Sequence, residues 1–139
     1  MTQENFIGNY DIDTKVCDKI IDFFDELPNR YKIQGMSYKG ETREIDLKKK
    51  ESIDLFVKPG LFFSPFREYE EELQKCLEQY IEKYKALDNY CRFSLSDEGY
   101  NVQWYPPGGG FKVWHSERGA PSVANRVLVF MTYLNDVED

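Results

Sequence analysis

The hydrophobic period of this sequence changes near residue 89, and this change limits the folds that the chain can adopt. Before it, apolar residues recur at the spacing of an amphipathic helix, and after it they alternate with polar residues as in a half-buried strand. Helices that precede a group of strands are typical of an α+β fold, with the helices packed on an antiparallel sheet. We therefore predict a single domain over residues 1–139, with helical support over about 1–90 and a β core over about 91–139.

Two helices are expected in the first part of the chain. The apolar stripe of the first helix covers about residues 14–27, and Asp13 or Thr14 can cap its N-terminus. The second helix is expected to begin at Ser64-Pro65, with the serine as N-cap and the proline at the first helical position.

The segment between the helices carries one short predicted strand, at residues 53–57. The three lysines at 48–50 are interpreted as a solvated loop rather than a binding patch. The whole chain carries 18 Lys and Arg against 25 Asp and Glu, a formal charge of −7. Because nucleic-acid binding depends on basic contacts to phosphates, this acidic balance argues against a nucleic-acid partner.

The second part of the chain reads as strands and turns. Alternating residues at 92–96, 101–105 and 111–117 predict three strands. The block Pro106-Pro107-Gly108-Gly109-Gly110 is expected to be a hairpin turn. Residues 126–134 are apolar at nearly every position, which is typical of a strand buried on both faces.

The sequence carries no signal for a membrane or for export. No uninterrupted apolar run approaches the ~20 residues of a membrane helix, and residues 1–5 lack the basic and apolar regions of a signal peptide. Cys17, Cys76 and Cys91 form no C-x-x-C pair, so neither a disulfide framework nor a zinc knuckle is indicated. We expect a chain without a membrane partner, in the reducing cytoplasm.

His115 is the single histidine of the chain, and it stands two residues before Glu117. Residues two apart on a strand point to the same face, so the two side chains are expected side by side near the end of strand 111–117. A neutral imidazole and a carboxylate form a ligand pair that suits Fe(II) or Mn(II). On spacing alone, a hydrogen-bonded surface pair remains the alternative.

Other catalytic patterns have less support. No G-x-S-x-G elbow accompanies His115, and no Gly-Lys-Ser/Thr follows the three glycines at 108–110. A Cys–His pair stays open, because the two partners need not be close in sequence.

The segment from Val102 to Glu117 resembles the iron-binding segment of the prolyl 4-hydroxylase-like 2-oxoglutarate/Fe(II) oxygenases. In that family a strand ending in an aromatic residue leads through a Pro/Gly turn into a strand with His-x-Asp or His-x-Glu. Residues 126–135 are similar to the family's next core strand, which commonly ends in Tyr-Leu-Asn. The close resemblance covers about residues 100–135, and it implies a partial double-stranded β-helix, a jelly-roll or cupin-like fold.

The resemblance assigns roles to four residues. It implies that His115 and Glu117 are two of three metal ligands, that Tyr105 lines the cosubstrate pocket, and that the Tyr133 hydroxyl binds the distal carboxylate of 2-oxoglutarate. The implied cofactor is Fe(II) and the cosubstrate is 2-oxoglutarate, with ascorbate as a possible addition. The implied reaction is hydroxylation of a C–H bond in an unknown substrate.

The sequence departs from the family in two ways. Glu117 replaces the commoner Asp, and the family's Gly-Gly-Glu-Thr-like strand, second histidine and later Arg or Lys are absent from these residues. We interpret the chain as the N-terminal portion of an oxygenase, inactive alone. The alternatives are a non-catalytic binding or assembly module that retains the scaffold, and a site completed by another polypeptide.

Residues 127–134 also bear on association. Both faces of this segment are apolar, and the helices can cover one of them. An uncovered apolar strand is a template for pairing with another chain, so we expect a homo-oligomer, most simply a two-fold dimer.

Overall fold

The computed structural model describes residues 5–40, 42–61, 63–87, 98–119 and 121–137. Within these ranges the chain is α+β, as the change of period predicts, with two α-helices and short antiparallel strands. The helices are α1 (Thr14–Glu26) and α2 (Phe66–Lys83), with short 3-10 helices η1 (Asn29–Tyr31) and η2 (Pro121–Val123). The strands are β1 (Ile33–Gln34), β2 (Ser37–Lys39), β3 (Thr42–Glu44), β4 (Lys50–Glu51), β5 (Ile53–Val57), β6 (Tyr100–Trp104) and β7 (Gly110–Phe111).

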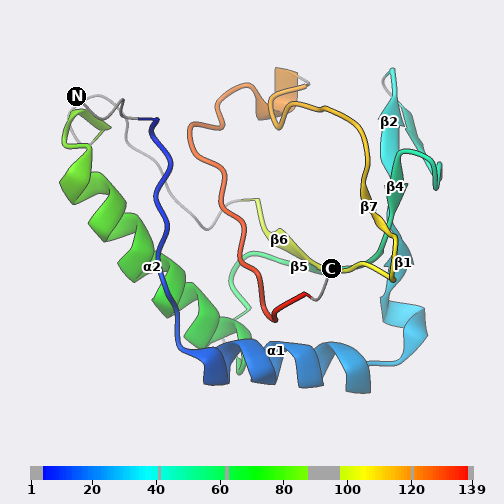
Figure 1. The fold of residues 1–139 in the computed structure, drawn as a ribbon, viewed down its shortest axis with the longest axis horizontal. Coiled ribbons are helices and arrows are strands. Elements are labelled where there is room, and N and C mark those ends of the chain that lie inside the picture. The colour runs from blue at the N-terminus through cyan, green and yellow to red at the C-terminus, as the bar shows by residue number, and fades with distance from the viewer. Residues whose placement is uncertain (1–4, 41, 62, 88–97, 120, 138–139) are drawn as a thin grey trace.

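The strands form three small antiparallel sheets. One has the order β1-β5-β6, and the others pair β2 with β3 and β4 with β7. Figure 1 shows α1 and α2 along two sides of the molecule, with β5, β6 and the last part of the chain inside the angle between them. The helices therefore support one side of the strands, as expected.

The helix boundaries confirm one predicted cap and correct the other. Asp13 caps α1, because its carboxylate accepts a hydrogen bond from the Lys15 N–H at 3.0 Å. The prediction that Ser64 caps α2 is wrong. Pro65 is the N-cap, its carbonyl oxygen accepts from the Tyr69 N–H, and the Ser64 side chain bonds to Glu68 instead. That bond is the largest cause of the lowered pKa of Glu68.

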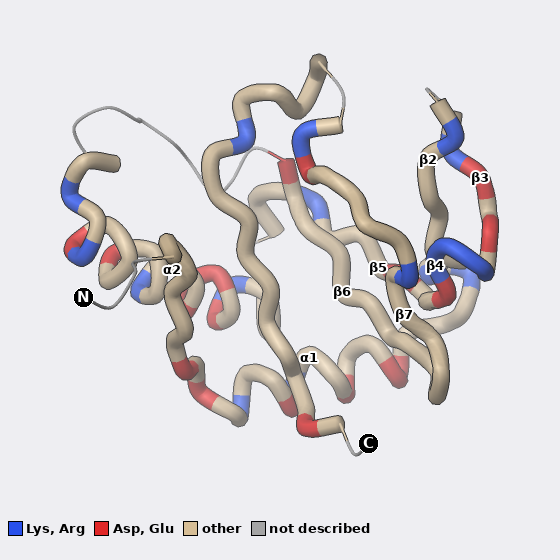
Figure 2. Tube along the Cα trace, turned by 45° about the horizontal axis from the view of Figure 1, so that its top comes forward, with Lys and Arg blue, Asp and Glu red and all other residues tan. Residues whose placement is uncertain are grey.

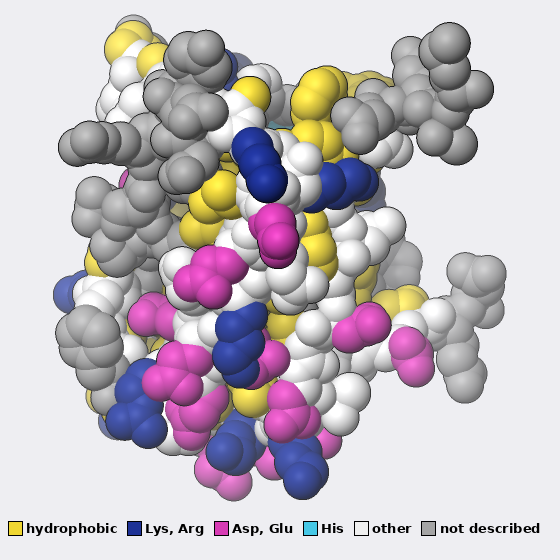
Figure 3. Space-filling view, turned by 90° about the vertical axis from the view of Figure 1, so that its left-hand side faces the viewer, with side chains coloured by type: hydrophobic (Ala, Val, Ile, Leu, Met, Phe, Trp, Pro, Cys, Tyr) yellow, Lys and Arg dark blue, Asp and Glu magenta, His cyan; other side chains and the backbone are white. Residues whose placement is uncertain are grey.

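The outer face of α2 is charged, as its amphipathic pattern requires. Arg67 pairs with Glu71 at 3.6 Å, and Lys75 pairs with Glu72. Figure 3 views the molecule from the α2 side and shows acidic and basic side chains interleaved over its lower part. No helix in the described ranges is long and apolar enough to cross a membrane.

The hydrophobic core lies between the helices and the sheet. Its centre is a buried cluster of Val16, Ile20 and Tyr69. Strand β6 contributes Tyr100 and Val102 to it, and these residues pair in register with Val57 and Leu55 of β5. Because alternate residues of a strand share a face, this face of β5–β6 looks to the helices and the opposite face carries Asp54 and Gln103.

The Pro/Gly block is a loop within one strand pairing, and the prediction of a hairpin turn is wrong. Strands β6 and β7 are not paired with each other; β6 pairs with β5 and β7 with β4. From the pair Glu51↔Gly110 to the pair Ile53↔Trp104, the β4–β5 side spans two residues, whereas the β6–β7 side spans six. The four extra residues on the β6–β7 side form a loop that leaves the strand pairing after Trp104 and returns to it at Gly110. Gly109 stays close to it, since a Cβ there would lie 2.9 Å from the Glu51 carbonyl oxygen.

The predicted strand at 111–117 is correspondingly short. Only Gly110–Phe111 pair, and one further bond joins the Lys112 N–H to the Lys49 carbonyl at 2.7 Å. The described residues after Lys112 form no strand, because β4 offers only two residues to pair with. The predicted strand at 92–96 lies outside the described residues.

The C-terminal segment, residues 126–137, corrects the prediction of a strand buried on both faces. It is not assigned as a strand, and only one row of its side chains packs on the molecule. Phe130 packs edge-on against Tyr100, the Thr132 hydroxyl lies 2.9 Å from that of Tyr69, and Leu134 joins the core cluster. The alternate row is exposed because no other described element covers it.

Candidate functional site

His115 and Glu117 lie on the loop that follows β7, with His115 Nε2 3.3 Å from Glu117 Oε1. The His115 ring stacks on the Phe111 ring, with centroids 3.9 Å apart and planes inclined by 16°. Trp114, between them in sequence, points to solvent and is fully exposed. The structure thus brings the two predicted metal ligands together, on a loop rather than on a strand.

The orientation of the imidazole follows from its other nitrogen. His115 Nδ1 lies 3.2 Å from the Val113 carbonyl oxygen. A carbonyl oxygen can only accept, so this contact is a hydrogen bond when Nδ1 carries the ring hydrogen. In a neutral ring Nε2 then presents a lone pair to the Glu117 carboxylate, and two acceptors face each other. A proton or a metal cation shared by His115 Nε2 and Glu117 Oε1 would remove the repulsion between their lone pairs.

The spacing of these two atoms fits a divalent metal ion. Nitrogen and oxygen ligands at about 2.1 Å from one ion lie roughly 3.0–3.4 Å apart at octahedral to tetrahedral angles. The 3.3 Å between His115 Nε2 and Glu117 Oε1 falls in that range. No group of three His, Cys, Asp or Glu side chains suited to a metal occurs within the described ranges. The pair therefore offers two protein ligands and not a complete triad.

Arg126 holds the second oxygen of Glu117, a role that the sequence analysis missed. Its Nη1 donates to Glu117 Oε2 at 3.1 Å and to the Glu117 carbonyl at 3.0 Å. Its Nε donates to Glu98 Oε2 at 2.7 Å, and this hydrogen bond is the largest cause of the raised pKa of Arg126. Arg126 thereby ties the 112–119 loop to the turn before β6, and leaves Glu117 Oε1 facing His115.

Tyr105 begins a second group of polar contacts, on the sheet face away from the helices. Its hydroxyl donates to Gln103 Oε1 at 3.0 Å, and Gln103 Nε2 donates to Asp54 Oδ2 at 3.3 Å. Burial, and then the charge of Asp54, raise the pKa of Tyr105. The phenol therefore stays protonated at neutral pH and donates its hydrogen to Gln103.

Lys50 and Asp54 form a buried ion pair beneath this group. Lys50 Nζ lies 2.6 Å from Asp54 Oδ2, Ser52 Oγ donates to Asp54 Oδ1 at 2.7 Å, and each of the three residues is at most 5% exposed. The interpretation of the lysine cluster as solvated is therefore wrong for Lys50, although Figure 2 shows basic residues gathered around β4. The available signal was the alternation of Lys50, Ser52 and Asp54 along one strand face.

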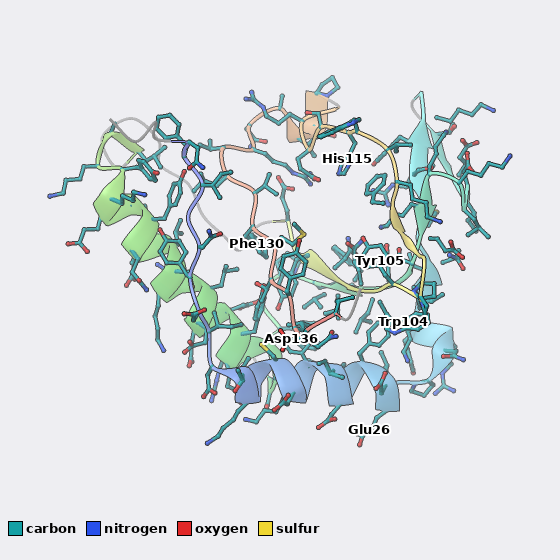
Figure 4. The ribbon with its side chains drawn as sticks, viewed as in Figure 1. Glu26, Trp104, Tyr105, His115, Phe130 and Asp136 are labelled. Carbon is teal, nitrogen blue, oxygen red and sulfur yellow. The ribbon has the colours of Figure 1, made fainter. Side chains whose placement is uncertain are left out.

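Lys50 also connects the two groups. Its Nζ lies 5.7 Å from the centroid of the Phe111 ring, on which His115 stacks. One chain of contacts therefore runs from the Tyr105 hydroxyl through Asp54 and Lys50 to the imidazole. Figure 4 shows that Tyr105 and His115 are themselves well separated, at the two ends of the intervening loop.

Tyr133 is not joined to either group. It lies on the exposed row of the C-terminal segment and is 77% exposed. Within the described ranges its hydroxyl makes no hydrogen bond and it does not contact Tyr105. The structure thus brings together three of the four predicted site residues through intermediaries, and leaves the fourth apart.

The alternative of a Cys–His pair gains no support. Cys17 lies on α1 and Cys76 on α2, and burial raises the pKa of both thiols, which disfavours a nucleophilic thiolate. Neither is in contact with His115 in the described part of the chain. Cys91 lies outside the described residues.

An open apolar pocket of about 260 Å³ lies elsewhere, between α1, η1, β5, the chain before α2 and the first residue of α2. Its walls are Phe23, Leu27, Tyr31, Leu55, Phe56, Val57, Leu61, Phe63 and Phe66. Apart from the Tyr31 hydroxyl, these side chains carry no polar group, so the cavity offers nothing for metal or acid–base chemistry.

Comparison with known proteins identifies no relative. No protein-family model, no curated protein and no solved structure matches this chain. The interpretation of the site therefore depends on the geometry described above and on the motif around His115.

The buried ion pair yields a prediction about stability. Asp54→Ala leaves the Lys50 ammonium buried without its counter-ion, which costs about 3–5 kcal/mol of unfolding free energy. The double variant Lys50→Met/Asp54→Leu removes both charges and is expected to cost much less. Urea denaturation followed by circular dichroism measures both; an equal loss in the two variants would contradict the assigned role.

Arg126 yields a prediction about the loop. Arg126→Gln removes the charged donor that ties Glu117 to Glu98, so the 112–119 loop should open more often. Since the guanidinium is partly exposed, we expect about 1 kcal/mol, or roughly fivefold faster trypsin cleavage after Arg118. Arg67→Gln, which removes an exposed pair on α2, is the matched control and should leave that rate unchanged.

Proposed function

We propose that this chain carries part of the active site of a non-haem Fe(II)- and 2-oxoglutarate-dependent dioxygenase, within a partial jelly-roll scaffold. The observation that carries the proposal is the His115–Glu117 pair, whose Nε2 and Oε1 atoms lie 3.3 Å apart, the spacing that two ligands of one divalent ion would have. The Val113 carbonyl lies beside Nδ1, the kind of contact that orients a metal-ligating histidine with Nε2 as its ligand atom. The same geometry fits a protonated His115 paired with Glu117, and the metal titration below separates the two.

Different residues would bind the metal and the cosubstrate. His115 and Glu117 would hold Fe(II), and Phe111 and Arg126 keep the two ligands in place. Tyr105 would line the cosubstrate pocket, and the Tyr133 hydroxyl, once brought to it, would donate to the distal carboxylate of 2-oxoglutarate, which needs donors to offset its desolvation. When bound, Fe(II) would supply C–H hydroxylation with dioxygen as the oxidant: one oxygen atom would enter the substrate, the other would enter succinate as 2-oxoglutarate loses CO2, and ascorbate would keep the iron reduced. The free thiols of Cys17 and Cys76 are compatible with the cytoplasmic location that we propose.

Two features limit what this chain does alone. A third protein ligand is absent from the described residues, and Tyr133 stands apart from Tyr105. The alternative function is a binding or assembly module that keeps the scaffold without catalysis, and the exposed apolar row of the C-terminal segment favours it. Metal binding separates the two functions, because an assembly module does not require it.

The first test is metal affinity. We expect the chain to bind Mn(II) weakly, because two protein ligands hold a metal less tightly than three. His115→Ala and Glu117→Ala should each lower the affinity roughly tenfold or more, which corresponds to at least about 1.4 kcal/mol. Electron paramagnetic resonance of free Mn(II) during an anaerobic titration measures it.

Glu71→Ala is the control for this titration, since Glu71 is an exposed carboxylate on the outer face of α2. It should bind Mn(II) as the wild type does. Equal binding by the wild type and His115→Ala would remove the metal site from the proposal and leave the assembly module.

The second test is turnover. The purified chain with Fe(II), ascorbate and 2-oxoglutarate is expected to release no succinate above the background without protein. The physical reason is that the iron would be held by two protein ligands and the cosubstrate would lack a paired cation. Steady succinate release that His115→Ala abolishes would instead show that the described residues suffice for catalysis.

A further inference from the structure

The buried ion pair of Lys50 with Asp54 lies next to the proposed metal site without supplying a ligand to it. Both residues are 5% exposed, and Lys50 Nζ lies 2.6 Å from Asp54 Oδ2. Replacing such a pair by apolar residues of similar volume is often neutral or stabilising, because both ions lose their hydration on burial. Stability alone therefore does not account for the pair, and the contacts of Lys50 indicate another role.

Lys50 faces the ring of Phe111 across two paired strands. The two residues are directly opposite in the register of β4 and β7, and Lys50 Nζ lies 5.7 Å from the ring centroid. Opposite residues of an antiparallel pair have side chains on the same face, so the contact follows from the register. An ammonium group within about 6 Å of an aromatic centroid is attracted by the negative face of the ring.

The ammonium group is a fixed charge in this contact. Asp54 Oδ2 accepts a hydrogen bond from Lys50 Nζ, and Ser52 Oγ donates to the other oxygen of Asp54 at 2.7 Å. Gln103 Nε2 also donates to Asp54 Oδ2, at 3.3 Å. Because Asp54 is held from several sides and the pair is buried, the charge stays beside the ring, whereas a surface lysine would exchange this position for water.

Phe111 is the last side chain that the strand pairing orients before the candidate site. Strand β7 ends at Phe111, and one further backbone hydrogen bond holds Lys112. His115 lies on the following loop, and its ring stacks on the Phe111 ring with centroids 3.9 Å apart. The position of the imidazole therefore depends on the position of the Phe111 ring.

We propose that Lys50 is a positioning residue for His115, acting through the Phe111 ring, and that Asp54 holds Lys50 in place for this task. The proposal rests on the proposed function only in its consequence for metal affinity. The stack of the two rings forms without a metal, so the positioning is tested separately from metal binding.

The variant that tests the proposal removes the cation without leaving a buried charge. Lys50→Met/Asp54→Leu removes both charges, so the net charge of the chain is unchanged and no ion stays buried alone. The matched control is Lys112→Gln/Glu51→Gln, which removes the exposed ion pair that joins the same two strand segments at 2.8 Å. Phe111→Leu removes the ring and Phe111→Tyr keeps it; Phe111 is 37% exposed, so these changes leave the core intact.

The first measurement is the proton magnetic resonance signal of the His115 ring in the untagged protein without metal. His115 is the single histidine of the chain, so its signal identifies itself. Stacking on Phe111 places the imidazole protons over an aromatic face, which shifts them upfield of their position in the denatured protein. On the alkaline plateau of this signal, the upfield shift should disappear in Phe111→Leu and remain in Phe111→Tyr.

The Lys50→Met/Asp54→Leu variant decides the role of the cation. Its upfield shift at His115 should be smaller than in the wild type, because the ring has lost the charge that holds it. The Lys112→Gln/Glu51→Gln control should keep the full shift. An unchanged shift in the first variant, or an equal decrease in the two, would overturn the proposal.

The second measurement is the Mn(II) titration. Lys50→Met/Asp54→Leu should bind Mn(II) roughly threefold more weakly than the wild type, which is the scale of one cation–π contact. The Lys112→Gln/Glu51→Gln control should bind as the wild type does. A smaller shift at His115 together with unchanged Mn(II) affinity would contradict the positioning role. Equal Mn(II) binding by the wild type and His115→Ala would instead remove the metal site, and the His115 signal would still decide whether Lys50 positions the imidazole.

Discussion

The antiparallel pairing of residues 50–57 with residues 100–111 is the constraint on which the rest of the structure depends. It sets Tyr100 and Val102 beside Val57 and Leu55 on the face that the helices cover. It sets Gln103 opposite Asp54 on the other face, where the polar group of the candidate site forms. One pairing thus separates the hydrophobic core from the candidate site.

The interruption of that pairing decides where His115 lies. Four extra residues in the Pro/Gly loop bring the chain back to β4 at Gly110, and the short β4 then releases it after Lys112. The following loop has no ladder to orient its side chains. Ring stacking on Phe111 and the ion pair of Glu117 with Arg126 supply the orientation instead, so the site is built from side-chain contacts on a loop.

The C-terminal segment is held by side-chain contacts and not by strand pairing. Tyr69 and Tyr100 give it contacts for one row of side chains, and these contacts hold it in an extended form without strand hydrogen bonds. The outer row then remains exposed, and with it Tyr133. Because Tyr133 belongs to this exposed row, its side chain points away from the molecule and does not reach the polar group around Tyr105.

The sequence alone determined the features that depend on near neighbours along the chain. The span of α1, strands β5 and β6, and the closeness of His115 to Glu117 all follow from periodicity and short-range spacing. The sequence left the cap of α1 open between Asp13 and Thr14, and the structure has Asp13. Only the tertiary structure decided three other features: the burial of Lys50, the strand that pairs with the chain after the Pro/Gly block, and the row of residues 126–134 that is covered. Each of these depends on a partner far away in the sequence: Phe111 for Lys50, β4 for β7, and Tyr69 and Tyr100 for the C-terminal segment. The ion-pair partner of Lys50, Asp54, is only four residues away, so that pair had a local signal in the alternation of the strand. A residue's own neighbours determine which local conformations are favourable, but burial and pairing depend on which distant surface the folded chain brings against it.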